Sequence, residues 1–331
     1  DEFHSGESLV YSGARGRPGG TLTTIPASGT ISFSNFYASE KFVQSDSFTL
    51  FSASSAFSAY SSSTRQDTTT VTVPAEANAI YIINTSAGGG GGIRGSDHKD
   101  VGEDPGDGGG GGAGIESGYF TVVGGETLTL SAGRGGDNNV AFWPTSGTAY
   151  VQTSNSANID GGNTSIVGSS SGTLFNLGGG SGAIATSVGA FKSLRQDSAG
   201  SGGAVGSFSG NLSSGTTTGG NSVSSVVSRA GGNGSDGASV GENQSGSGGR
   251  GGYSGVVSGH SGEFAGGVGG SNNTKGSNGN IGGGGGGGHS QSTANPAGGT
   301  SADGDHPAAG ASTHGGLGGR GQIKYKFVRV I

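Results

Sequence analysis

The chain has 331 residues, of which 29% are apolar, 11% are charged and 79 are glycine, and its net charge is −6. Ordinary globular domains are about 45–50% apolar and about 25% charged, so one conventional hydrophobic core across the whole chain is excluded. The acidic balance argues against nucleic acid as a partner, the lack of cysteine excludes disulfides and thiolate metal sites, and no apolar run reaches the roughly 20 residues of a membrane span.

The first part of the chain is poor in glycine and has little periodicity. Residues 1–25 carry turn formers and basic side chains, which favour an attachment arm or a free terminus. Position 1 is not methionine, which leaves open whether the N-terminus is processed. Ile31, Phe33 and Asn35 alternate with serines as in a half-buried strand. We expect an attachment arm with a small β segment in 1–67 and a glycine-rich β domain in 68–331.

From residue 68 onward, short runs alternate in the manner of strands and are separated by turn formers. Two of them flank Gly124-Gly125, which predicts a hairpin. In the last run, Ile323, Tyr325 and Phe327 share one face and Lys324 occupies the other. The predicted strands cover 70–73, 79–83, 118–123, 126–131, 163–167, 173–175 and 323–331.

Glycine dominates from Ala87 to Gly321, with unbroken tracts at 88–92, 108–112 and 282–288. Such a composition favours disorder, because glycine loses the most conformational entropy on folding. Ordered glycine can instead form extended left-handed helices, with three residues per turn, that bond to their neighbours through the backbone. We expect the second state: an all-β fold with almost no α-helix, in which a sandwich-like framework carries packed polyglycine II segments.

The spacing of the glycines sets limits on this array. Glycine does not occur at every third position, so a collagen triple helix is excluded. Between 200 and 275 the glycines are spaced irregularly among serines, which predicts that a regular helix array does not extend there. No apolar repeat of helical period survives the glycines.

The order of these parts resembles a known family. A strand follows "Val-Pro-Ala"; next come two glycine tracts, a Tyr-x-Thr-Val strand and "Gly-Glu-Thr-Leu-Thr-Leu". "Ala-Gly-x-Gly-Gly", "Gly-Gly-Asn-Thr-Ser" and a final Ile-Lys-Tyr strand complete the order. Residues 68–331 thereby resemble the glycine-rich domain of phage tail-fibre and related virion proteins. Pro26–Tyr37 resembles a short element of phage virion proteins. The chain is also similar to tip adhesins of T-even-type phages, which implies stacked polyglycine helices and variable loops at the far end.

Two catalytic-looking strings occur in the glycine-rich part. Gly168–Gly172 matches the nucleophile-elbow pattern, but no strand-turn-helix context surrounds it. The Gly90-x-Gly92-x-x-Gly95 string matches a dinucleotide fingerprint, but no amphipathic helix follows. Both matches are what chance gives in a chain rich in glycine and serine, so we expect no catalytic residue, no enzymatic activity and no cofactor.

An acidic loop follows the first glycine tract, between Asp97 and Asp107. Its oxygen ligands could hold Ca²⁺, but their spacing fits no EF-hand, and a solvated charged loop is the alternative that we favour. The six histidines are scattered without metal-ligand spacing. We expect no metal site, and Ca²⁺ binding at 97–107 stays open.

The segment 137–150 interrupts the glycine pattern and holds the single tryptophan. Aromatic rings beside amides are typical of loops that contact sugars or proteins. The alternative is that the rings fill a local core that glycine cannot fill. The candidate receptor-contact residues are Phe142, Trp143, Tyr150, Asn138 and Asn139.

Two functions fit these features. The first is a non-enzymatic receptor-binding component of a phage virion, a tail fibre or tail-tip adhesin. Its partners would be other tail proteins and a host cell-surface glycan or outer-membrane protein, with a homo-oligomer expected. The second is a bacterial extracellular filament or matrix protein that donates its C-terminal strand, 323–331, to a neighbour. Ice binding or sugar cleavage is a third possibility, although the β-patterned segments hold no paired carboxylates.

Overall fold

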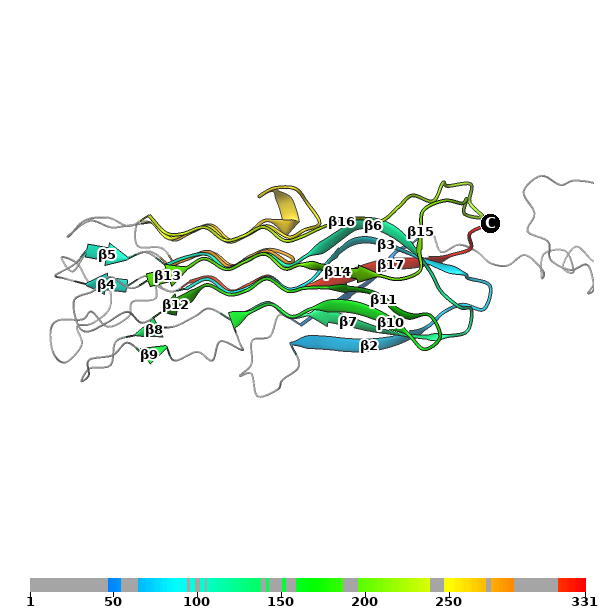
Figure 1. Cartoon of the computed structure of the whole chain (residues 1–331), viewed down its shortest axis with the longest axis horizontal. Coiled ribbons are helices and arrows are strands. Elements are labelled where there is room, and N and C mark those ends of the chain that lie inside the picture. The colour runs from blue at the N-terminus through cyan, green and yellow to red at the C-terminus, as the bar shows by residue number, and fades with distance from the viewer. Residues whose placement is uncertain are drawn as a thin grey trace, which may run out of the picture.

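A computed structural model describes residues 47–54, 65–93, 96–98, 102–104, 106–137, 141–142, 151–152, 159–186, 196–238, 247–271, 275–288 and 315–331. The fold is all-β, with 35% of the chain in strands and 2% helical, as predicted. Two antiparallel sheets face each other at one end of an elongated molecule (Figure 1).

The first sheet has six strands in the order β1-β17-β3-β6-β15, and β16 also pairs with β6. Its strands are β1 (Thr49–Ser52), β3 (Ala79–Ser86), β6 (Gly114–Thr121), β15 (Asn211–Leu212), β16 (Val227–Arg229) and β17 (Gln322–Val328). The second sheet has the order β14-β11-β10-β7-β2. Its strands are β2 (Gln66–Thr72), β7 (Thr127–Gly133), β10 (Thr164–Gly168), β11 (Gly172–Leu177) and β14 (Val205–Phe208).

The apolar core lies between these two sheets. From β3, Ile80 and Ile82 are fully buried, and they belong to the same cluster as Leu128 and Leu130 of β7. The ring of Phe120 lies 5.6 Å from that of Phe175 in the opposite sheet. Each such side chain contributes about 1.5–3 kcal/mol on burial, so this small core is where the few large apolar residues stabilise the fold.

The hairpin predicted across Gly124-Gly125 is wrong. β6 pairs with β3, β15 and β16, whereas β7 pairs with β2 and β10. The turn therefore connects the two sheets instead of two neighbouring strands of one sheet. The physical reason is that Phe120 and Leu128 both point into the core, which they reach from opposite sides.

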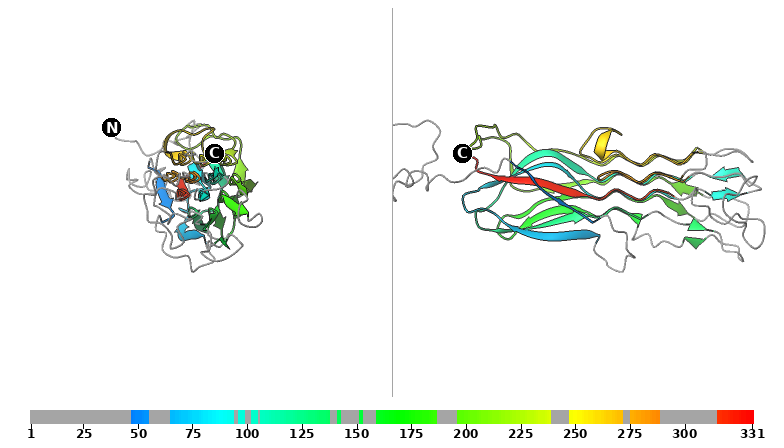
Figure 2. Two further views of the ribbon diagram at one scale, coloured as in Figure 1. Left: turned by 90° about the vertical axis from the view of Figure 1, so that its left-hand side faces the viewer. Right: turned by 180° about the vertical axis from the view of Figure 1, so that it is seen from behind.

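Extended glycine-rich segments continue from the sandwich along its long axis (Figures 1 and 2). We call them together the glycine array. Some are outgoing, running away from the sheets, and the others return. The array consists of 87–93, 106–113, 133–137, 159–163, 178–183, 199–204, 230–238, 247–256, 265–271, 275–288 and 315–321.

The array is held by backbone hydrogen bonds that repeat every three residues. The amides of Ala87, Gly90 and Ile93 donate to the carbonyls of Ala113, Gly110 and Asp107, at 2.9, 2.8 and 2.9 Å. This repeat matches three residues per turn. Among the described glycines of 87–93, 106–113 and 282–288, only Gly282 has a positive φ, 66°. Extended backbone with negative φ and three residues per turn is the left-handed polyglycine II form.

Each unbroken glycine tract lies inside the array. The outgoing segment 87–93 donates its amides to three returning segments, and its carbonyls accept from three outgoing ones. The amides of 87–93 donate to 107–113, 159–162 and 316–319. The carbonyls of 87–93 accept from 136, 180–183 and 285–288. The tracts 108–112 and 282–288 are likewise bonded to six neighbouring stretches of the array. A Cβ added to Gly285 would overlap the backbone of Gly316, so close packing requires glycine there.

Segments at the perimeter show a different repeat: two glycines and one larger residue. In 247–253 the larger residues are Ser247, Arg250 and Tyr253, and in 265–271 they are Ala265, Val268 and Ser271. With three residues per turn, every third side chain lies on the same side of the segment. Arg250 and Val268 are exposed and the glycines between them are mostly buried. The prediction that a regular array does not extend into 200–275 is therefore wrong for 200–204, 230–238, 247–256 and 265–271.

Candidate functional site

The end of the array far from the sheets is the distal end, where outgoing segments turn and become returning ones. Three two-stranded ribbons lie there (Figure 1). They are β4 (Ser96–His98) with β5 (Gly102–Asp104), β8 (Ala141–Phe142) with β9 (Val151–Gln152), and β12 (Ile184–Thr186) with β13 (Gln196–Ser198). The C-terminus lies at the opposite end, beside the sheets. The two ends thus differ: the three ribbons lie at one end and the chain terminus at the other.

The predicted aromatic contact segment belongs to the distal end. β8 and β9 bracket it, with Phe142 opposite Val151 in the register. Asn138, Asn139, Trp143 and Tyr150 lie outside the described residues. The structure therefore gives the location of both flanks of the segment, and contact by the five candidate residues stays a prediction.

The acidic loop also turns at the distal end. β4 and β5 pair with Asp97 opposite Glu103. Asp107 is only 3% exposed, and its Oδ1 accepts a 2.8 Å hydrogen bond from the amide of Gly237. Among the described residues, no group of three His, Asp or Glu side chains is arranged to hold a metal ion. Asp107 thus stabilises the array, a role that the ligand hypothesis did not anticipate.

Polar side chains close the hydrogen bonding at the perimeter of the array. An amide there lacks one of its neighbouring backbones, and a side-chain oxygen takes the place of the missing carbonyl. Asn163 Oδ1 accepts from the amide of Gly179 at 3.0 Å, and Asn233 Oδ1 accepts from the amide of Gly202 at 2.9 Å. Satisfied backbone amides are what a buried or half-buried lattice requires.

Glu126 is a buried carboxylate that accepts four hydrogen bonds, and no pattern in the sequence points to it. It is 5% exposed. Its Oε1 accepts from the amide of Val123 at 2.6 Å, and its Oε2 accepts from the amides of Ser170 and Ser171 at 3.0 and 2.9 Å and from the hydroxyl of Ser171 at 3.1 Å. Burial opposes its charged form, but these hydrogen bonds outweigh burial and lower the pKa of Glu126.

This contact also explains the nucleophile-elbow string. Gly168–Gly172 is the turn between β10 and β11, which are antiparallel neighbours. A strand follows the serines, in contrast to the helix that a nucleophile elbow requires. The string therefore forms a hairpin turn fastened to Glu126.

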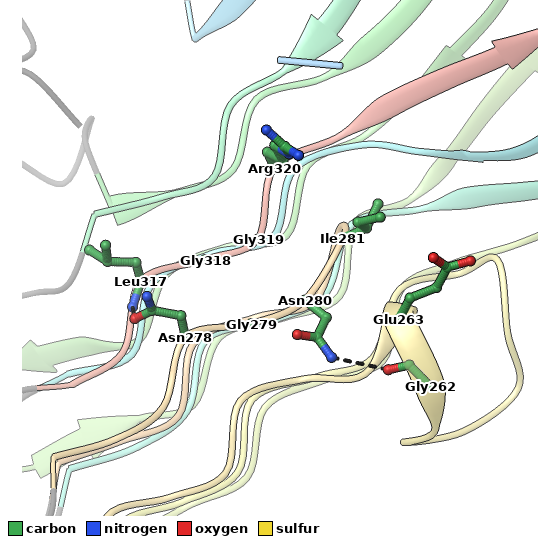
Figure 3. Close-up of a pocket in the computed structure, with 10 residues that line it drawn as sticks. All are labelled: Gly262, Glu263, Asn278, Gly279, Asn280, Ile281, Leu317, Gly318, Gly319 and Arg320. Carbon is green, nitrogen blue, oxygen red and sulfur yellow. Dashed lines mark hydrogen bonds between the residues drawn. The ribbon is translucent and has the colours of Figure 1, made fainter. Parts of the chain in front are cut away.

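A shallow groove of about 590 Å³ lies on the flank of the array, beside the 3₁₀ turn η2 (Gly262–Phe264) (Figure 3). Its floor is the backbone of Gly279, Gly318 and Gly319. Asn280 Nδ2 donates to the carbonyl of Gly262 at 3.0 Å across one end. Further lining residues are Glu263, Asn278, Ile281, Leu317 and Arg320. The groove offers amides and both signs of charge, the chemistry of a site for a polar ligand.

Comparison with known proteins identifies the family. A model of the glycine-rich domain matches residues 63–327. The chain belongs to this glycine-rich domain family. No curated protein matches the sequence. The match begins three residues before β2 and ends one residue before the end of β17.

The glycine-rich domain therefore includes the two sheets and the array. The boundary expected between residues 67 and 68 falls inside β2. β1 lies N-terminal to that boundary and pairs with β17, Thr49 opposite Tyr325, so at least this strand is part of the same sheet. No helix among the described residues is long and apolar enough to cross a membrane.

Proposed function

We propose that the glycine-rich domain of this chain is a non-enzymatic receptor-binding adhesin of a tailed phage, located on the virion outside the cell. One observation carries this proposal: the ribbons β4–β5, β8–β9 and β12–β13 lie at the end of the array opposite the C-terminus. A protein fixed to a particle at the sheet end would present those ribbons to the host. Its partners would be other tail proteins and a host glycan or outer-membrane protein.

The array suits such a role because the residues that hold its shape differ from the residues that could determine binding specificity. Its interior is backbone bonded to backbone, so it holds the turns in place without depending on their sequence. The ribbons β4–β5, β8–β9 and β12–β13 belong to different crossings of the array, and several weak contacts can therefore act together. Copies of the chain on one particle would multiply this effect.

The rival function is a bacterial filament or matrix protein that donates its C-terminal strand. β17 pairs with β1 on one side and with β3 on the other. Donation of this strand would have to break both sets of hydrogen bonds, so this arrangement favours the adhesin.

The test compares the full chain with a variant in which a short Gly-Ser turn replaces 138–158. Both proteins are purified and incubated with cells of the bacterium on which the particles are grown, and bound protein is measured. We expect the wild-type chain to bind and the variant to lose at least tenfold in binding, with an unchanged melting temperature. Absence of the chain from purified tailed particles would refute the proposal.

A further inference from the structure

The outer face of the six-stranded sheet has a covered half and an open half. Over the covered half, Tyr119, Val223, Val328 and Ala79 form a small buried cluster. The excursion between β15 and β16 supplies Val223. This half of the face is thus part of the interior.

The open half contains Phe48, Leu50, Tyr81, Lys324 and Lys326, and we call it the β1–β17 face. Leu50 lies opposite Lys324 in the register and is 56% exposed. The ring of Tyr81 stacks on Tyr119 at 4.2 Å and lies 5.7 Å from the ring of Phe48. The alternate residues of β17 point into the core, so the two lysines point outward. Leu50 is exposed, whereas Phe48 and Tyr81 are half-buried.

The charge of the β1–β17 face differs from that of the whole chain. The ammonium groups of Lys324 and Lys326 lie 5.8 and 5.1 Å from the centre of the Phe48 ring. Neither lysine takes part in an ion pair among the described residues, where the pairs are those of Arg65, Arg134 and Arg229. On a chain of net charge −6, the face therefore presents two positive charges over apolar side chains.

An open backbone edge borders the same face. Among the described strands, β1 pairs only with β17, so its other side can accept a further strand. Both ammonium groups are held over Phe48, which precedes β1 directly. A strand added to β1 would therefore pass close to them.

We infer that the β1–β17 face binds an extended acidic segment of another protein, which pairs with β1 and places carboxylates beside Lys324 and Lys326. Its apolar side chains would cover Leu50. A second copy of this chain fits less well, because a symmetric contact would bring the lysines of one copy against those of the other. The inference deepens the proposed function, since the partner would be the particle component to which the adhesin attaches.

The first experiment locates the partner. Assemblies that contain the full chain are treated with a carbodiimide, which joins a lysine to a carboxylate in direct contact, and the products are mapped by mass spectrometry. We expect Lys324 and Lys326 to be joined to Asp or Glu of another protein, and exposed Lys275 on the array to serve as the unjoined control. Joining to the chain's own Asp1, Glu2, Glu7, Glu40 or Asp46, to a second copy, or to nothing would overturn the inference.

The second experiment tests the charges. Lys324→Glu with Lys326→Glu should weaken binding of the joined partner at least tenfold, and the matched change of exposed Lys275→Glu with Arg250→Glu should not. Changing the joined carboxylates of the partner to lysine should restore binding to the first variant. Unchanged binding, or binding of the wild-type chain to vesicles of anionic lipid in place of the protein, contradicts the inference.

The outcomes separate this inference from the proposed function. Suppose that a partner is crosslinked to the lysines and that its binding depends on their charge, but that this partner is absent from tailed particles. This result would support the inference about the β1–β17 face and refute the proposed adhesin function. Host binding that survives the lysine changes, together with loss of the chain from particles, supports both.

Discussion

The amide of Gly285 donates a 2.8 Å hydrogen bond to the carbonyl of Gly90, which joins two polyglycine tracts from distant parts of the sequence. Both tracts are buried, and neither has a side chain to place between them. The contact that oily side chains make in an ordinary core is made here by peptide groups. Several predictions of stability depend on this difference.

Replacing Gly285 with valine should destabilise the protein strongly. The new Cβ would overlap the carbonyl of Gly316 and approach the backbone of Leu317, and overpacking of this kind costs about 1–3 kcal/mol or more. Thermal unfolding measures the effect. The control is Gly259→Ala, because a Cβ at Gly259 meets no atom within 4 Å and its φ is not positive. Equal melting temperatures for the two variants would mean that the tract is not packed.

Hydrogen exchange should protect the amides of 88–92 and 282–288. Each of these amides has a backbone acceptor, which for Gly283 is Asn280 in the same turn and for the others lies across the array, so exchange requires the array to open. Exchange followed by mass spectrometry on the intact protein gives the rates. Rates typical of an unfolded chain in these tracts would show that the array does not form in solution.

Removing a perimeter side chain should cost less than disrupting the interior. Asn233→Ala leaves the amide of Gly202 without its acceptor, and we expect a loss of about 1 kcal/mol. Asn233→Asp keeps an acceptor oxygen and should retain most of the stability. Exposed Asn176 on β11 provides an alanine control. Chemical unfolding separates the three variants, and a loss for Asn176→Ala as large as for Asn233→Ala would contradict the role of the side chain as an acceptor.

Glu126 should make stability depend on pH. Its pKa is lowered in the folded protein, so its contribution is fully present above the usual glutamate value of about 4.3. That contribution is lost as the pH falls through the lower folded pKa. Glu126→Gln should cost about 2 kcal/mol at neutral pH and flatten the acid limb of the stability curve. Melting curves from pH 7 to 3 test this, with exposed Glu76→Gln as the control.

Two variants of the aromatic segment 137–150 should show whether its rings contact a receptor or pack in a local core. Trp143→Ala and Tyr150→Ala are measured for melting temperature and for binding to host cells. Truncation of an aromatic hot spot costs about 2 kcal/mol or more in binding, so lost binding with unchanged melting supports contact. A lower melting temperature supports the alternative that the rings fill a local core. If both properties are unchanged, the segment is not part of the site, and attention moves to 191–195.

Much of the β-sheet framework could be predicted because apolar and polar residues alternate along its strands. The pattern of 323–331 gives the two faces of β17 correctly: Ile323, Tyr325 and Phe327 pack in the core, and Lys324 does not. The partner of each strand could not be predicted. Gly124-Gly125 is the same turn signal whether the chain returns to its own sheet or crosses to the other.

The array was predictable in kind but not in extent. Glycine does not keep a three-residue period along the whole chain, but 247–253 and 265–271 repeat two glycines and one larger residue locally. The unbroken glycine tracts form the interior of the array because a segment with six neighbouring segments has no free side on which a Cβ could fit. Glu126 could not be predicted, since its partners Ser170 and Ser171 come from a distant turn.

The extended form of the array has a mechanical consequence. Polyglycine II rises about 3.1 Å per residue, against a limit of roughly 3.3–3.6 Å for a fully stretched chain. The segments therefore have little length to give when the distal end is pulled away from the sheets. A pull along the axis acts on the lateral hydrogen bonds in shear, so that many of them share the load and must yield together. The array would transmit force as a nearly inextensible rod, while its turns remain free to vary.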